Sequence, residues 1–171
     1  MHDVQDGDPD IHWPSGFAPG LAHGFCHAHT VVRAPASRVF ARLIDVERWP
    51  LWVPGVERVR FGAPQNTFEL WLGDDRFEVI VGEQVPHTRL GWSGIGARTL
   101  LYQAWLLRPR GDGATHVVSE SVVRGPAGPG PGRADRLNAL WLARLRRTLE
   151  ADPPPDAAAP GDSAPHEPFP L

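Results

Sequence analysis

Residues 34–56 restrict the possible folds more than any other part of the sequence. Pro35 suits the first turn of a helix, where its missing N–H would have no intrahelical acceptor in any case. An apolar stripe at helical spacing follows and predicts a helix of about two to three turns. The stripe consists of Val39, Phe40, Leu43 and Ile44. Trp49-Pro50 ends this helix, because the residue before a proline is displaced from the helical region.

A second short apolar segment follows at Trp49 to Val56, and Pro54-Gly55 within it turns the chain into a run of strands. Glycine, proline and aspartate punctuate that run, and several segments alternate apolar and polar residues as half-buried strands do. The expected strands are 25–33, 57–61, 67–72, 76–85, 89–93, 99–108 and 115–124. The glycine- and proline-rich residues 125–132 form a hinge into a last helix at 133–150.

The order of these elements predicts one α+β domain at residues 24–150, with a curved antiparallel sheet of about seven strands around the last helix. That helix presents an apolar stripe to the sheet, made of Leu137, Leu140, Trp141, Leu145 and Thr148 or Leu149. Residues 1–23 are an N-terminal extension, which we expect to dock partly through Trp13 and Phe17. Residues 151–171 are rich in proline and alanine and are expected to be a disordered tail.

Five parts of the sequence resemble the START/Bet v 1-like superfamily (SRPBCC), in particular its bacterial polyketide cyclase/dehydrase branch. They are HTVVRAP (29–35), VFARLIDVERWPLWVPGV (39–56), VPHTRLGW (85–92), YQAWLLRPRGDGATHVVSESVVRG (102–125) and the C-terminal amphipathic helix. They occur in the order expected for that superfamily over roughly residues 24–150. The resemblance implies a helix-grip fold, whose two short helices follow the first strand and whose cavity lies between sheet and last helix. It implies no specific catalytic residue.

Composition excludes several classes of function. The net charge is −3, which does not favour nucleic-acid binding. All 17 basic residues are arginine, so chemistry that needs a lysine amine is excluded. The single cysteine, Cys26, cannot form an intrachain disulfide and is typical of a reducing compartment. The polar N-terminus lacks a signal-peptide core, and no run is long enough to span a membrane, so we predict a cytoplasmic protein without membrane insertion.

The candidate ligand-binding residues come from the strands and helix expected to surround the cavity. They are Trp92, Arg98, Tyr102, Trp105, Glu120, Leu137 and Trp141. Tyr102 and Trp105 lie on opposite faces of their strand by parity, so only one of them points inward from a regular strand. We favour Tyr102, whose phenol would orient a ligand. The alternative is a tyrosine at the rim that reaches water.

Glu120 shares a strand face with Val118 and Val122. It is either an exposed carboxylate on a β-branched surface or a buried acid with a raised pKa. If it is buried, Glu120 is the first candidate for an acid/base role, with Tyr102 or Arg98 polarising a carbonyl group. His27 and His29 share one strand face, but zinc needs three or four protein ligands. We therefore predict neither a metal nor a cofactor.

Three functions follow from these observations. The favoured one is non-covalent binding of a small hydrophobic molecule (a polyketide, lipid or aromatic metabolite) in the internal cavity. The second is an enzyme, a polyketide cyclase, aromatase or dehydratase that uses Glu120 and Tyr102 as catalytic residues in the same cavity. The third is a domain whose cavity is filled by its own tryptophan and leucine side chains and which serves partner contact. The oligomeric state stays open.

Overall fold

The structure is a computed structural model that describes residues 7–125 and 131–151. Seven strands, three α-helices and two short 3-10 helices follow one another along these residues. In chain order they are η1 (Pro19–Leu21), β1 (Gly24–Val32), α1 (Ala36–Ile44), η2 (Val46–Arg48), α2 (Trp49–Trp52), β2 (Val56–Phe61), β3 (Thr67–Leu72), β4 (Asp75–Val85), β5 (Arg89–Ile95), β6 (Leu100–Pro109), β7 (Thr115–Arg124) and α3 (Pro131–Ala151). Ala151 is the last residue of α3, and the rest of the proposed tail and most of the proposed hinge lie outside the described residues.

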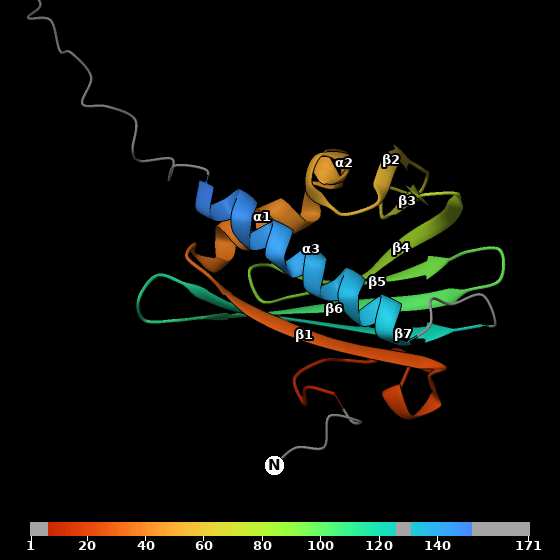
Figure 1. The fold of residues 1–171 in the computed structure, drawn as a ribbon, viewed down its shortest axis with the longest axis horizontal. Helices are drawn as coiled ribbons and strands as arrows, with labels where there is room; N and C mark the ends of the chain where they lie inside the picture. Colours follow the sequence, from red (N-terminus) through yellow and green to blue (C-terminus); the bar gives the residue numbers. More distant parts are fainter. Residues whose placement is uncertain (1–6, 126–130, 152–171) are drawn as a thin grey trace, which may run out of the picture.

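All seven strands belong to one antiparallel sheet in the order β1-β7-β6-β5-β4-β3-β2. Figure 1 shows α3 lying across one face of this sheet, with α1 beside α3 and α2 near β2. The first strand pairs with the last, so β1 and β2 are the two edge strands of the sheet and β1 lies beside α3. The predicted helix-grip α+β fold is confirmed.

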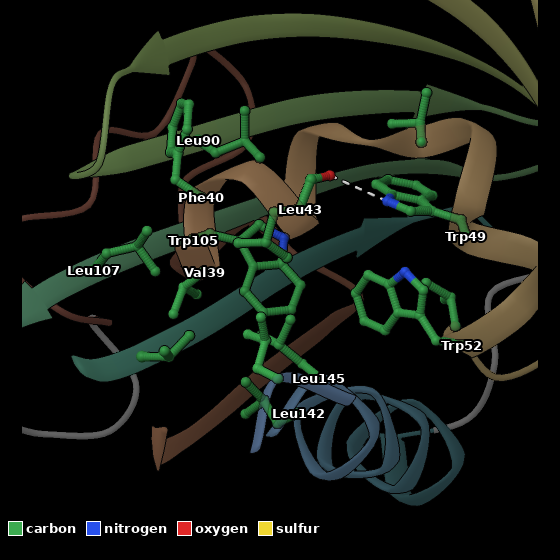
Figure 2. Packing of buried hydrophobic residues seen from close by; sticks show 14 of the residues in the cluster. Val39, Phe40, Leu43, Trp49, Trp52, Leu90, Trp105, Leu107, Leu142 and Leu145 are labelled. Atoms are coloured by element: carbon green, nitrogen blue, oxygen red, sulfur yellow. Dashed lines mark hydrogen bonds between the residues drawn. The ribbon is translucent and has the colours of Figure 1, made fainter. Parts of the chain in front are cut away.

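The corner formed by α1 and α2 seals one end of the space between sheet and α3. Val39 and Leu43 of α1 and Trp49 of α2 are all fully buried. The indole Nε1–H of Trp49 donates a hydrogen bond of 3.1 Å to the Leu43 carbonyl, which joins the two helices (Figure 2). Ile44 was expected in the apolar stripe, but it lies in the last turn of α1 and is 41% exposed.

The two faces of the sheet carry two separate apolar clusters, because successive side chains along a strand point to opposite sides. The larger cluster lies between the sheet and α3, and Figure 2 shows Trp105 of β6 meeting Leu142 and Leu145 of α3 there. The smaller cluster lies on the other face, around Tyr102 and Leu106 of β6. Both sides of β6 are therefore buried.

Residues 8–17, named here the N-terminal strap, cover that second face. The aromatic rings of Trp13 and Phe17 lie 5.8 Å and 5.7 Å from the ring of Tyr102, and Ile11 is buried in the same cluster. Arg108 binds Asp8 through both terminal guanidinium nitrogens, at 2.8 Å and 2.7 Å. In Figure 1 the N-terminal strap lies across the sheet from α3.

Candidate functional site

An apolar cavity of about 130 Å³ lies between the sheet and the first half of α3. Every strand from β2 to β7 contributes to its wall, and α3 closes it. Its lining residues are Val53, Pro54, Val56, Leu70, Leu72, Phe77, Val79, Trp92, Gly94, Leu101, Gln103, Ser121, Val123, Ala134, Leu137, Asn138 and Trp141. Among the described residues, this lining contains no side chain that titrates near neutral pH. We call this space the inner cavity.

Three polar side chains meet the apolar wall at the base of the inner cavity. Gln103 Nε2 of β6 donates to Ser119 Oγ of β7 at 2.5 Å, and Ser119 Oγ donates to Asn138 Oδ1 of α3 at 2.8 Å. The Asn138 amide also donates to the Ser119 carbonyl oxygen at 3.1 Å. A buried network of this kind is retained only where its groups find partners, and it fixes the position of α3 on the sheet. Gln103 and Asn138 both face the inner cavity.

A wider mouth of about 690 Å³, with charged side chains among its lining residues, continues the inner cavity toward solvent. The two spaces share six lining residues, namely Val56, Leu72, Phe77, Leu101, Val123 and Leu137. The β3–β4 hairpin, the β5–β6 turn and the start of α3 form the rim. The rim carries three acidic and three basic residues, namely Glu57, Asp74, Asp75, Arg76, Arg98 and Arg133. The mouth therefore has no net preference for one sign of charge.

Five tryptophans form a group between the sheet and α3, and two of them, Trp92 and Trp141, also line the inner cavity. The Trp141 ring lies 5.4 Å from that of Trp49 and 5.2 Å from that of Trp105, with both pairs edge to face. Trp92 and Trp52 complete the group. The indole N–H groups of Trp52, Trp105 and Trp141 are buried and have no hydrogen-bond acceptor among the described residues. These large rings reduce the inner cavity below the size of about 300 Å³ at which drug-sized pockets begin.

The predicted ligand-binding residues divide into four groups, of which the last, Tyr102 and Glu120, lies on the opposite face of the sheet. Trp92, Leu137 and Trp141 line the inner cavity, and Arg98 lies at the mouth. Trp105 points to the same face and packs in the tryptophan group without lining the cavity. Leu140 was expected to face the sheet but is 44% exposed on the outer side of α3.

The prediction that Tyr102 points into the cavity is wrong. Tyr102 and Trp105 do lie on opposite faces of β6, but Trp105 faces α3 and Tyr102 packs under the N-terminal strap. Its hydroxyl lies over Gly91 of β5, where a Cβ atom would come within 2.1 Å of the phenolic oxygen. Burial raises the pKa of Tyr102 to about 12. A glycine at position 91 therefore makes room for this ring.

Glu120 is fully buried, but it also lies on the face opposite the cavity. Its Oε1 accepts hydrogen bonds of 2.7 Å from the Asp8 backbone N–H and from His27 Nδ1, and its Oε2 has no partner among the described residues. Burial raises the pKa of this carboxyl, against the opposing effect of the His27 and Asp8 hydrogen bonds. Neither Glu120 nor Tyr102 lines the cavity, which corrects their expected location in it.

Sequence reasoning missed Gln103, Ser119 and Asn138. In the register of β6 and β7, Ser119 lies opposite Trp105, and Gln103 lies opposite Ser121. Single polar residues in two neighbouring apolar strands are a weak signal, because strand parity shows only that Gln103 and Trp105 share one face. Asn138 within the apolar stripe of the last helix was the stronger signal. No group of three or more His, Cys, Asp or Glu side chains suited to a metal ion occurs among residues 7–125 and 131–151.

Within the same residues, no helix has the length and apolar character required to cross a bilayer. A curved antiparallel sheet closed over a long C-terminal helix, with a cavity between them, defines the START-like class of helix-grip proteins. Residues 26–151 match the family model described as "Polyketide cyclase / dehydrase and lipid transport". The chain belongs to this family.

Solved structures share the fold at low sequence identity. A hypothetical protein, jhp0584 from Helicobacter pylori, is 18% identical with a TM-score of 0.74, and the match covers 83% of this chain and 97% of that one. A START superfamily protein from Mycobacterium smegmatis is 17% identical with a TM-score of 0.59, covering 74% and 94%. The di-domain ARO/CYC StfQ of the steffimycin biosynthetic pathway is 20% identical with a TM-score of 0.61, covering 72% and 44%. The comparison with curated proteins found no match.

Proposed function

We propose that this protein binds a small, largely apolar molecule whose ring occupies the inner cavity and whose polar end lies in the mouth. The observation that carries the proposal is the continuity of an apolar inner cavity with a wider mouth lined in part by charged side chains. A cavity of about 150 Å³ with apolar walls is large enough to hold benzene. The inner cavity is of similar size, so it suits one aromatic ring or a short acyl segment rather than a whole fused-ring system.

Gln103 and Trp141 supply orientation in this proposal. The Nε2 group of Gln103 is engaged by Ser119, which leaves its amide oxygen as an acceptor toward the cavity wall. Trp141 lines the cavity with its ring, and its indole N–H is buried away from the cavity as well as from solvent. In this proposal an aromatic ligand packs against the Trp141 ring, and a ligand hydroxyl donates to the Gln103 amide oxygen. The preferred ligand is accordingly an aromatic ring with a hydroxyl substituent.

The second candidate, a cyclase, aromatase or dehydratase, is favoured by the family description and requires an acid or base beside the substrate. The inner cavity offers only amide, hydroxyl and indole groups, and the nearest carboxylates belong to the mouth. Glu120, the acid expected from the sequence, lies across the sheet. Binding therefore accounts for the groups in the cavity better than acid–base catalysis does.

Calorimetric titration with benzene, phenol and p-cresol tests the proposal. Ala134→Leu places a larger side chain in the wall of the inner cavity, whereas Ala139→Leu makes the same change at an exposed position of α3. We expect phenol to bind more tightly than benzene, Ala134→Leu to weaken phenol binding at least tenfold, and Ala139→Leu to leave it unchanged. Absence of binding by the unchanged protein would instead favour the third function, a domain filled by its own side chains.

A further inference from the structure

The outer face of α3 carries a row of arginines that the proposed function does not use. Arg133, Arg136, Arg144 and Arg147, together with Leu140, make up this arginine stripe. At 3.6 residues per turn the five positions fall within an arc of about 80°, and they extend over about 21 Å of helix. All four arginines are exposed. The stripe therefore consists of two pairs of arginines along one side of α3, with Leu140 between the pairs.

The arginines of the stripe have no ion-pair partner among the described residues. Several arginines outside the stripe are paired with acids, for example Arg108 with Asp8 and Arg89 with Glu83. The acids of α3 point in other directions. Glu150 pairs with Arg146 and accepts the backbone N–H of Arg33, and Asp135 lies nearly opposite the stripe by helical position.

The stripe does not serve the stability of α3. Arg133 and Arg136 are three residues apart, as are Arg144 and Arg147, and like charges at this spacing destabilise a helix. The whole chain carries a net charge of −3, so these four charges are a local concentration against the overall sign. Leu140 lies in the middle of the stripe and is 44% exposed. Unpaired guanidinium groups around an exposed leucine indicate a surface that meets an anionic and partly apolar partner.

We propose that the arginine stripe docks on the surface of a membrane that contains anionic lipids, with α3 lying in the plane of the interface. The guanidinium groups would bind lipid phosphates and Leu140 would enter the headgroup region. A bilayer is favoured over a nucleic acid or an acidic protein because the row is straight and has a leucine at its centre. Arg133 and Leu137 also line the cavity mouth, so docking brings the mouth to the membrane surface.

Sedimentation of the full-length protein with phospholipid vesicles tests this proposal independently of cavity occupancy. We expect binding to phosphatidylcholine vesicles that contain about one third phosphatidylserine at 0.01 M salt, and little binding to pure phosphatidylcholine vesicles. Binding should weaken steeply at 0.5 M salt, because exposed charges are then screened within a few ångströms. Each arginine near an anionic surface contributes about fivefold in affinity, so R136Q/R147Q should bind about thirtyfold more weakly.

The matched control is R48Q/R110Q, which removes the same charge from exposed arginines outside the stripe. This control should bind the anionic vesicles within about twofold of the unchanged protein, and Leu140→Gln should bind a few times more weakly. Circular dichroism establishes that each variant is folded. Equal binding by R136Q/R147Q and the control would overturn the proposal. Failure of the unchanged protein to bind anionic vesicles at low salt would also overturn the proposal. If the protein then bound RNA or an acidic peptide through the stripe, the partner would be that macromolecule and not a membrane.

Discussion

Glu120 shows how one side chain can be buried for a reason other than catalysis. Its Oε1 receives the Asp8 N–H, and its Oε2 lies against Gly7, where a Cβ would come within 2.7 Å of that oxygen. Gly7 also has a φ of +76°, a conformation that glycine adopts readily. The Asp8 carboxylate binds Arg108, which lowers the pKa of Asp8 against the effect of its burial. Glu120 thus acts as an anchor for the N-terminal strap.

The pH dependence of stability tests this placement of Glu120. Because burial raises its pKa above the ordinary 4.5, the Glu120 contribution to stability is fully present below that value and is lost as pH rises through the raised pKa. Asp8 acts oppositely, and its contribution is lost only as pH falls below about 3.8. The unfolding free energy of the unchanged protein should therefore increase relative to Glu120→Gln between pH 7 and pH 5. Urea denaturation measures this difference, and a constant or reversed difference would show that Glu120 is solvated.

The corner of α1 and α2 is the element that holds the end of the core. Trp49 contacts rings from three other elements, with centroids 5.5 Å away at Phe68, 4.9 Å at Trp92 and 5.4 Å at Trp141. Its hydrogen bond to Leu43 is the polar part of the same contact. The corner therefore links α1, α3 and the sheet through one side chain.

Replacing Trp49 should lower the free energy of unfolding much more than replacing Leu51 in the same helix. Trp49→Phe removes a buried hydrogen bond and part of a buried ring, so we expect it to lower the unfolding free energy by about 2–4 kcal/mol. Leu51 is 80% exposed, and Leu51→Ala should change stability by less than about 0.5 kcal/mol. Thermal and urea denaturation compare the two. Similar effects of both changes would mean that the corner does not carry the core.

Sequence patterns predicted the elements well and the orientation of side chains on β6 and β7 poorly. The β3 and β7 bounds agree with prediction at every residue, because turn signals and alternation coincide there. On β6 both faces are buried, one by α3 and the other by the N-terminal strap, so apolar content could not separate Tyr102 from Trp105. In the sequence, the only sign of the strap was the presence of Trp13 and Phe17 in an otherwise polar segment. The hydrogen bond between Asp8 and Glu120 could not be predicted, because it joins residues more than 100 positions apart.

At the scale of the whole molecule, the fold separates two surfaces of different chemistry. The concave face and α3 enclose an uncharged cavity, while the opposite face holds the buried acid and the strap. The inner cavity between the sheet and α3 is connected to solvent through the mouth. This division supports ligand binding between sheet and helix, and it places the titratable groups of the opposite face outside the binding site.

The most direct test of ligand binding between sheet and helix is a crystal structure of the protein soaked with p-iodophenol, whose iodine gives an anomalous signal. We predict one ordered ring between Trp92, Leu137 and Trp141, with its hydroxyl beside Gln103. Iodine found under the N-terminal strap near Tyr102, or an inner cavity that stays without the ring at saturating concentration, would contradict the assignment of the ligand site.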